Sequence, residues 1–404
     1  MKIKKIGILR ETKTPPDRRV PFSPAEVHKL QQQFPGVEVV VQPSPIRCYL
    51  DEEYRKAGIP LQENPEDCDV LMGVKEVKKE TLIPGKTYFF FSHTAKKQPY
   101  NRDLLREVLH RKIKLVDYEY LTAPNGARLV AFGHWAGIVG AYNALRAWGE
   151  RTGDYTLKPA HKCHDRKEMV QQLDKVKLPP IKILITGGGR VAFGALETLT
   201  PLHLKQVAPE EFLTTNYDEP VVCRIDPDHY VIRKDYAPFD LKHFFQHPGM
   251  YRSVFLPYTK TADLFIACHY WDPHSPVFMK PEDYRAPGFR IKVVADVSCD
   301  IRKPIPSTLR ASTIANPFYG YNPETEGEGY PFTPDNITVM AVDNLPGELP
   351  RDASGDFGNM LLDRVMPALL GEDKDKIIER ATITENGRLT EHFKYLQGYV
   401  EGKE

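Results

Sequence analysis

The chain has 404 residues, of which 41% are hydrophobic and 27% are charged, and its formal net charge is +1. This balance gives no electrostatic footprint for nucleic acid or an anionic membrane, so we expect small-molecule partners, no nucleic acid and no membrane. One hydrophobic core rarely serves so long a chain, and we therefore expect two domains with a cleft between them.

The cysteines and the N-terminal segment favour a cytoplasmic protein. The six cysteines are scattered without a CxxC pair, which is typical of free thiols in a reducing compartment. The apolar run that ends before Arg10 is too short for the core of a signal peptide. The longest apolar stretch, 129–145, falls short of a membrane span. Its three glycines predict instead a buried helix that another backbone can approach closely.

Predicted strands and helices alternate along the first half of the chain. Residues 3–9 read as a strand, and a helix is expected to begin after Ser23. Ser23 is suited to cap it, Pro24 fits its first turn, and Glu26 completes a capping box. Further strands are expected at 37–41, 70–74, 88–91 and 113–116, and helices at 52–57 and 103–110. This alternation indicates a parallel sheet.

Polar residues follow several of these strands, where ligands of parallel sheets bind. They are Arg10, Lys75, His93 and Glu119. A histidine titrates near neutrality, and a lysine near arginines can have its pKa lowered enough to share proton transfer. Lys75 and His93 are therefore a candidate acid/base pair. Arg10 and Arg19 have the guanidinium geometry that grips carboxylates, although position alone also suits a surface arginine.

A dinucleotide-binding turn is predicted in the middle of the chain, after a polar connector at 151–180. The strand 181–186 leads into Gly187-x-Gly189-x-x-Ala192 and a helix through 199. Gly187 permits the tight turn, and Gly189 lets backbone N–H groups approach a pyrophosphate at the helix N-terminus.

The coenzyme stays open between NAD and NADP. An acid usually follows the second strand about 20 residues on and binds the ribose 2′-hydroxyl of NAD. Residues 205–209, taken as the end of that strand, contain no acid, and Arg190 could meet a 2′-phosphate. We therefore expect a slight preference for NADP.

The remaining segments carry fewer signals. Residues 218–257 lack periodicity and are expected to decorate the second domain, strands are predicted at 264–268 and 291–297, and a long helix at 352–370. The run 161–164, His-Lys-Cys-His, has no second ligand group at zinc spacing, so no metal site is predicted.

Several motifs resemble a known superfamily. Residues 6–13 with 18–24 are similar to the N-terminal signature of alanine dehydrogenases, transhydrogenase α-subunits and lysine-forming saccharopine dehydrogenases. Later motifs resemble the lysine-ketoglutarate reductase domain of aminoadipic semialdehyde synthase and saccharopine dehydrogenase. These later motifs are 91–94, 116–119, 130–137, 295–300 and 343–354. The resemblance covers essentially the whole chain.

The resemblance implies roles for individual residues. Lys75 and His93 would be the acid/base pair, Arg19 and Arg128 would hold substrate carboxylates, and Glu76 and Glu119 would tune their charge. The cofactor site would be lined by Gly187, Gly189, Arg190, Val191, Asp296 and Asp343. The family's acid at the second strand is matched here by Ala208, which leaves the inherited coenzyme preference open.

The implied fold class is α/β, with two Rossmann-like doubly wound parallel-sheet domains and C-terminal helices that return to the first. Residues 1–134 completed by 347–404 would form the catalytic domain, and 135–346 the NAD(P)-binding domain.

The implied activity is formation or cleavage of saccharopine from lysine, 2-oxoglutarate and NAD(P)H. Two alternatives stay open. One is alanine dehydrogenase-like reductive amination of a small 2-oxo acid, and the other is a non-catalytic nucleotide-binding or transhydrogenase-like partner subunit. Assembly into a homo-oligomer is also left open.

Overall fold

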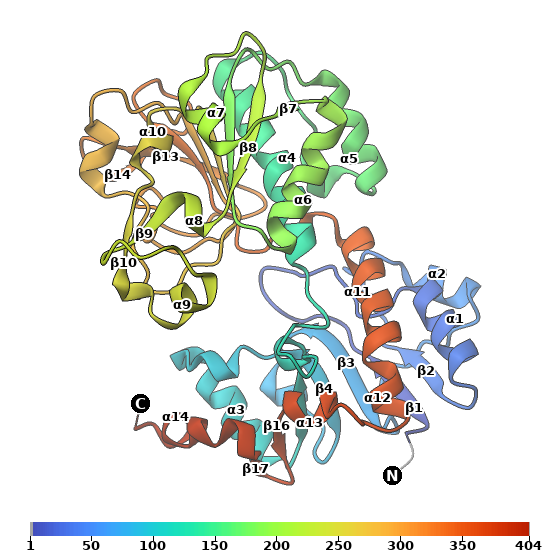
Figure 1. Cartoon of the computed structure of the whole chain (residues 1–404). Coiled ribbons are helices and arrows are strands. Elements are labelled where there is room, and N and C mark those ends of the chain that lie inside the picture. Colours follow the sequence, from blue (N-terminus) through green and yellow to red (C-terminus); the bar gives the residue numbers. More distant parts are fainter. Residues whose placement is uncertain (1–2, 404) are drawn as a thin grey trace. The chain divides into compact units, whose positions relative to one another are not determined.

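The computed structural model describes residues 3–403, and the chain divides into two compact units. Unit 1 comprises Met1–Phe132 together with Pro350–Glu404, and unit 2 comprises Gly133–Leu349. Figure 1 shows the red C-terminal segment lying among the blue elements of unit 1. Each unit is organised around its own sheet and its own cluster of buried apolar side chains.

Unit 1 contains a seven-stranded sheet with the order β17-β16-β5-β4-β3-β1-β2. Strands β1 to β5 pair in parallel, as the alternating sequence predicts. Its N-terminal elements are β1 (Lys5–Ile8), α1 (Pro24–Gln33), β2 (Glu38–Val41), α2 (Asp51–Lys56), β3 (Val70–Lys75), β4 (Thr87–Phe91), α3 (Arg102–His110) and β5 (Lys114–Asp117).

The start of α1 confirms the predicted capping box. Ser23 is the N-cap, Pro24 occupies the first turn, and the backbone N–H of Ser23 donates to Glu26 Oε2 at 3.2 Å. The apolar side of this helix, with Val27 and Leu30, is buried. These local signals fix where the helix begins, since they satisfy N–H groups that have no partner inside the helix.

The C-terminal segment contributes strands as well as the expected helices. Strand β16 pairs antiparallel with β5 and extends the sheet of unit 1, and α11 packs against α1. The elements of this segment are α11 (Pro350–Arg364), α12 (Met366–Leu370), α13 (Ile377–Ala381), β16 (Thr382–Glu385), β17 (Arg388–Leu389) and α14 (Gln397–Glu401). Unit 1 is therefore completed by residues far apart in sequence.

Unit 2 contains an eight-stranded sheet with the order β14-β13-β15-β12-β11-β6-β8-β7. The run from β7 to β15 is parallel, and β13 and β14 add an antiparallel edge. Its strands are β6 (Lys182–Thr186), β7 (Lys205–Gln206), β8 (Val221–Ile225), β9 (Val231–Arg233), β10 (Tyr251–Ser253), β11 (Leu264–Ala267), β12 (Val293–Asp296), β13 (Phe318–Asn322), β14 (Gly327–Gly329) and β15 (Ile337–Met340). Strands β9 and β10 form a separate small hairpin.

The helices of unit 2 are dominated by the pair α4 and α6, which cross in close contact. They are α4 (Gly133–Thr152), α5 (Arg166–Gln172), α6 (Arg190–Leu199), α7 (Pro209–Thr214), α8 (Pro227–Tyr230), α9 (Leu241–Gln246) and α10 (Leu256–Thr259). Fourteen residues of α4 are buried, in agreement with the buried helix predicted there. In residues 3–403, no helix combines the length and the apolar character that crossing a membrane requires.

One segment differs from the prediction. Residues 218–257 were expected to decorate the second domain, but their first part forms β8, which pairs in parallel with β6 inside the sheet. The part of the segment that follows β8, from α8 to β10, lies outside the main sheet. The short run Val221–Ile225 is a buried strand. A strand that is buried on both faces lacks the alternation of polar and apolar residues by which a strand is predicted from sequence.

Candidate functional site

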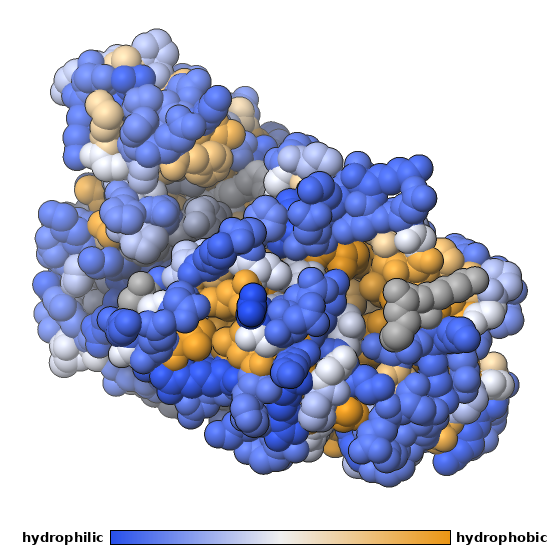
Figure 2. Space-filling view, turned by 90° about the horizontal axis from the view of Figure 1, so that it is seen from below, coloured by the Kyte–Doolittle hydropathy of each residue, from blue (hydrophilic) through white to orange (hydrophobic). Residues whose placement is uncertain are grey.

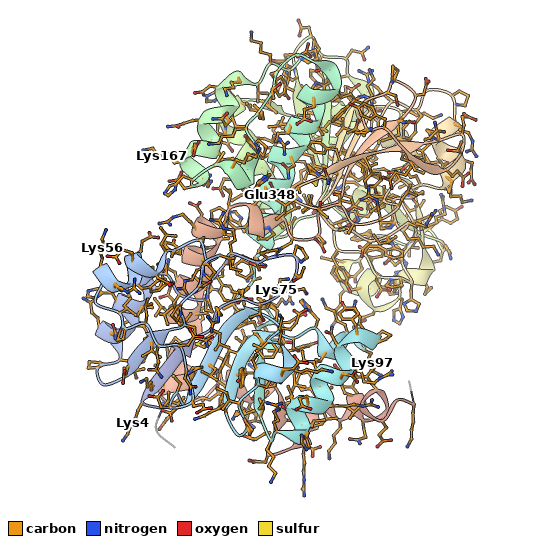
Figure 3. All side chains as sticks on the ribbon, turned by 180° about the vertical axis from the view of Figure 1, so that it is seen from behind. Lys4, Lys56, Lys75, Lys97, Lys167 and Glu348 are labelled. Atoms are coloured by element: carbon orange, nitrogen blue, oxygen red, sulfur yellow. The ribbon has the colours of Figure 1, made fainter. Side chains whose placement is uncertain are left out.

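Lys75 and His93 lie at the carboxyl edge of the sheet of unit 1. Lys75 is the last residue of β3, and His93 follows β4 by two residues. In the ladder, Lys75 pairs with Phe91, which brings the two strand ends side by side. Figure 3 labels Lys75 at the end of its strand, whereas Lys4 and Lys56 lie at the outer margin of the same unit.

The position matches the site expected for this sheet order. The parallel strands run β5-β4-β3-β1-β2, so the connections reverse direction between β1 and β3. Ligands of such sheets bind beyond the carboxyl ends of the strands at this switch point. Lys75 ends one of the two switch strands, and residues 9–13 follow the other.

The environment of Lys75 lowers the pKa of its amine. Burial is the main cause, and the nearby positive charges of Arg19 and Lys13 add to it, while Asp17 and Glu76 oppose it. A lysine in such surroundings gives up its proton more readily than a surface lysine. Lys75 can therefore serve as a proton donor and acceptor nearer to neutral pH.

His93 is held as a neutral imidazole. Burial, Lys75 and Lys96 lower its pKa to about 4, against the opposing charges of Glu76 and Glu119. Its backbone adopts the left-handed conformation with φ 53°. Non-glycine residues rarely adopt this conformation, and it is found preferentially at functional sites.

This lowered pKa predicts a specific titration behaviour. We expect the ring resonances of His93, assigned with His93→Gln, to stay unchanged between about pH 8 and 5.5, whereas unperturbed histidines titrate near 6.5. Protonation should begin only as the pH approaches the pKa of about 4. A full titration of His93 centred near 6.5 would contradict the described environment. Histidine NMR of the intact chain provides the measurement.

Two networks of oppositely charged side chains surround Lys75 and His93. In the first, Glu76 forms an ion pair with Lys13, and its Oε2 lies 3.9 Å from Nδ1 of His93. In the second, Glu119 lies between Arg128, at 2.7 Å, and Lys96, at 3.5 Å. Both predicted glutamates thus contact cations at the carboxyl edge of the sheet. Arg128 is joined to this edge by its ion pair with Glu119.

Arg19 lies in a buried corner of this edge. Its Nε and Nη2 donate to the two carboxylate oxygens of Asp17 at 3.0 and 2.6 Å, and its guanidinium lies 4.3 Å from the centre of the Phe132 ring. Although burial acts to raise the pKa of Asp17, the Arg19 charge and hydrogen bonds hold it well below its usual range. Asp17 therefore fixes the orientation of the guanidinium. It was not among the predicted site residues.

Arg10, the other predicted carboxylate clamp, contacts residues that follow β2. Its guanidinium forms an ion pair with Glu63, and its Nη1 donates to the backbone oxygen of Pro43 at 3.2 Å. Arg10 therefore lies at the carboxyl edge of the sheet, but it contacts the segment after β2 and is occupied by Glu63. Adjacent residues of an extended chain point in opposite directions, so a position beside a strand end does not settle where a side chain lies.

The glycine turn of unit 2 has the geometry of a phosphate-binding turn. It joins β6 to the N-terminus of α6. Gly187 has φ +102°, and an added Cβ would lie 2.7 Å from the backbone oxygen of Cys268. Gly189 is the N-cap of α6, and a Cβ there would meet no atom within 4 Å. The helix N-terminus is thus open to an anionic group, as the pyrophosphate of a dinucleotide requires.

The acid missing from the predicted second strand is present on another strand. The strand that pairs with β6 is β8, which is followed directly by Asp226, whereas β7 is a two-residue edge strand. A Cβ on Gly188 would lie 2.5 Å from Asp226 Oδ1, so the carboxylate borders the glycine turn. Arg224 holds it at 2.6 Å. Ala208, the residue matched to the family's acid, instead follows the edge strand β7.

The other predicted cofactor residues have different surroundings. Arg190 is exposed in the first turn of α6, and Asp343 is exposed after β15. Val191 packs against α4, where its Cγ2 lies 3.4 Å from a Cβ built on Gly133. Asp296 is fully buried and accepts hydrogen bonds from Ser298, Cys299 and Thr308. The carboxylate of Asp296 thus supports the loop after β12.

A cavity of about 620 Å³ in unit 1 lies away from these residues. It is lined by Val70, Thr87 and Lys114, the first residues of β3, β4 and β5, and thus opens at the amino ends of the strands. Ligands of parallel sheets bind at the opposite ends. Figure 2, a view from below, shows a surface that is mainly hydrophilic with small hydrophobic patches. We do not assign the site to this cavity.

The His-Lys-Cys-His run contributes to the packing of unit 2. Nδ1 of His161 lies 3.7 Å from Oε2 of the buried Glu348, and the thiol of Cys163 contacts the backbone oxygen of Pro159. Across the described range 3–403, no three His, Cys, Asp or Glu side chains are grouped to hold a metal ion.

Residues 7–139 match the family described as alanine dehydrogenase/PNT, N-terminal domain. Over 99% of its length, the chain is 31% identical to alpha-aminoadipic semialdehyde synthase, mitochondrial, of Rattus norvegicus, and it covers 48% of that protein. It thus spans about half the length of this relative. It is also 26% identical to saccharopine dehydrogenase (NAD(+), L-lysine-forming) of Yarrowia lipolytica, over 91% of each chain.

Two solved structures share the fold. An L-alanine dehydrogenase superposes with a TM-score of 0.64 at 17% identity, over 98% of this chain and 99% of the other. A transhydrogenase from Sinorhizobium meliloti superposes with a TM-score of 0.59 at 16% identity, over 96% of this chain and 100% of the other. These similarities agree with the predicted pair of Rossmann-like α/β sheets.

Proposed function

Because residues 7–139 match the alanine dehydrogenase/PNT N-terminal family and the chain is similar to proteins of saccharopine metabolism, we propose that it is an NAD(P)-dependent oxidoreductase that forms or cleaves saccharopine. Lysine, 2-oxoglutarate and the reduced coenzyme would be the substrates in one direction. Unit 1 would act as the catalytic domain and unit 2 as the coenzyme domain. The observation that carries the proposal is the Lys75–His93 pair at the switch-point edge of unit 1.

The pair suits the proton transfers of this reaction. The ε-amine of lysine attacks the C2 carbonyl of the oxo acid, and the neutral imidazole of His93 takes a proton from the nitrogen and passes it to the former carbonyl oxygen, which becomes the carbinolamine hydroxyl. The Lys75 ammonium then gives a proton to the carbinolamine hydroxyl, which leaves as water. The bound coenzyme would supply hydride to the resulting substrate imine carbon.

The surrounding cations suit the three carboxylates of the two substrates. Arg19 is oriented by Asp17. Arg128, Lys13 and Lys96 lie in the two networks of charged side chains around Lys75 and His93. Guanidinium groups bind carboxylates in a bidentate manner, so arginines in this region favour dicarboxylate or amino-acid substrates.

We propose NAD as the preferred coenzyme, which reverses the preference expected from the sequence. A carboxylate beside the glycine turn can accept hydrogen bonds from ribose hydroxyls and repels a 2′-phosphate. Asp226 occupies that position. The relative from Yarrowia lipolytica, whose name specifies NAD(+), agrees with this proposal.

Replacing Asp226 by alanine should change the coenzyme preference. We expect kcat/KM for NADH to fall about 10- to 100-fold, the effect of losing a charge-assisted hydrogen bond. The preference over NADPH should shrink further, because Arg224 loses its partner and becomes available to a phosphate. Steady-state kinetics with both coenzymes measure the effect, with Asp228→Ala, an exposed acid two residues on, as control. Unchanged coenzyme discrimination in Asp226→Ala would refute the assignment.

The proposed activity is tested by following coenzyme oxidation with lysine plus 2-oxoglutarate, and separately with pyruvate plus ammonia. We expect turnover with the first pair and little with the second. Turnover only with pyruvate and ammonia would instead indicate alanine dehydrogenase chemistry. Coenzyme binding without turnover of any amino acid would indicate a non-catalytic protein. The cytoplasmic location and the oligomeric state stay predictions from the sequence.

A further inference from the structure

Strand β3 leaves its regular ladder just before Lys75. The backbone N–H of Leu9 still donates to the oxygen of Met72 at 2.9 Å, but the pairing with β4 shifts register between Met72 and Lys75. Beyond this irregularity, the amides at the end of β3 need other acceptors, since a buried N–H without a partner is costly. The local geometry of Lys75 therefore depends on what replaces the ladder.

The carboxylate of Glu11 provides both acceptors. Its Oε1 accepts from the backbone N–H of Val74 at 2.6 Å, and its Oε2 accepts from that of Lys75 at 3.0 Å. A Cβ built on Gly73 would lie 3.4 Å from Glu11 Oε1, so the glycine leaves room for this close approach. The side chain of Glu11 thus replaces strand hydrogen bonds at two successive amides, those of Val74 and Lys75.

The same arrangement occurs at the end of the neighbouring strand. Oδ2 of the buried Asp117 accepts from the backbone N–H and the hydroxyl of Ser92 at 2.9 and 2.6 Å, and its Oδ1 accepts from the N–H of Glu119 at 2.8 Å. Ser92 immediately precedes His93. A carboxylate therefore accepts a backbone hydrogen bond at both members of the proposed acid/base pair. Glu11 binds the amide of Lys75 itself, and Asp117 binds the amide of Ser92, the residue before His93.

The buried Glu11 carboxyl lowers the stability of the fold at pH values above its ordinary pKa. Burial, with a smaller contribution from Asp17, raises the pKa of Glu11 to about 8, although its two amide donors and Arg19 favour the charged form. The native protein thus binds a proton that the unfolded chain releases near 4.5, and stability falls as the pH rises through this window. The hydrogen bonds from Val74 and Lys75 offset only part of the cost of burying the ionised acid.

We propose that Glu11 is a positioning residue for the reaction, which fixes the end of β3 and thereby directs the Lys75 side chain toward the substrate. This inference rests on the proposed function. Glu11 acts through the backbone and does not itself touch the substrate. A small misplacement of an acid/base group is enough to reduce catalysis strongly.

The test compares Glu11→Gln with Glu63→Gln, an exposed acid that pairs with Arg10 away from the site. Glutamine keeps the shape but can accept only one of the two N–H bonds, because its NH₂ group is a donor. We expect kcat at pH 9, where Glu11 of the wild type is ionised, to fall about 10- to 100-fold in Glu11→Gln. The KM for coenzyme should equal that of the wild type within error. The melting temperature at pH 9 should equal or exceed that of the wild type. Glu63→Gln should match the wild type in kcat.

Amide hydrogen exchange gives a readout that does not depend on turnover. We expect faster exchange at Val74 and Lys75 in Glu11→Gln and none of this change in Glu63→Gln. Unchanged exchange, or faster exchange with wild-type kcat, would overturn the positioning role. A lower melting temperature with normal kcat would mark Glu11 as structural only and would also overturn it. If the wild type turned over no amino acid, the proposed function would fail, and the exchange at 74 and 75 would decide alone whether Glu11 holds this strand end.

Discussion

Replacing Lys75 by methionine is expected to lower kcat for lysine plus 2-oxoglutarate by about 10²- to 10⁴-fold, the contribution typical of a positioned acid/base group. Methionine keeps much of the length and volume of the side chain but carries no transferable proton. The folded structure should tolerate the change, because burial and the charges of Arg19 and Lys13 already disfavour the ammonium at this position. Steady-state kinetics near the pH optimum provide the measurement.

The control for this variant is Lys56→Met, at the exposed end of α2 in the same unit. It should keep wild-type kcat and coenzyme affinity. Added small amines should restore part of the activity of Lys75→Met and leave Lys56→Met unaffected, since only the former lacks a proton donor at the site. Retention of more than about a third of the wild-type kcat by Lys75→Met would exclude Lys75 from the 10²-fold or larger role assigned to it.

Replacing Gly137 by alanine is expected to disrupt unit 2. An added Cβ would lie 1.8 Å from the backbone oxygen of Val191 and 2.9 Å from the backbone nitrogen of Ala195. Neither atom can move without displacing α6, because both belong to its backbone. We expect a loss of at least about 3 kcal/mol in the free energy of unfolding, the upper range for overpacking a core.

The consequence should reach coenzyme binding, because α6 begins at the glycine turn. For a unit of this size, such a loss corresponds to a fall of about 6 to 12 °C in melting temperature. Calorimetry and NADH fluorescence measure the two effects. Gly249→Ala is the matched control, since a Cβ there meets no atom within 4 Å. Wild-type stability of Gly137→Ala would contradict the close crossing of α4 and α6.

Much of the fold could be predicted from local signals. The capping box at Ser23 predicted the start of α1, and the apolar runs predicted the parallel strands β1 to β5. The glycines of the stretch 129–145 predicted a helix that another backbone approaches, and α4 crosses α6 in this way. Each of these signals depends on residues only a few positions apart.

The predictions that failed depended on pairing between distant segments. The sequence does not reveal that β8 rather than β7 lies beside β6, so Asp226 was missed. Strand β16 also escaped prediction, because its partner β5 lies some 270 residues earlier in the chain. Val221–Ile225 followed directly by an acid was the one local signal that could have identified Asp226.

The candidate site was predicted in part for a similar reason. Lys75 and His93 were chosen as residues that follow strands, and parallel strands bring such residues to one edge. The residues that hold them, Glu11, Asp17 and Asp117, are defined by hydrogen bonds to backbone and side chains. Such contacts depend on side-chain direction, which strand order alone does not determine.

The central claim is that hydride reaches the carbon of a new carbon–nitrogen bond. Deuterium transfer tests it most directly, with NADH deuterated at both C4 positions, lysine and 2-oxoglutarate incubated with the wild-type chain and the product examined by mass spectrometry. We predict one deuterium on the carbon derived from C2 of 2-oxoglutarate, bonded to the ε-nitrogen of lysine. Coenzyme binding without label in any amino-acid product would contradict the account.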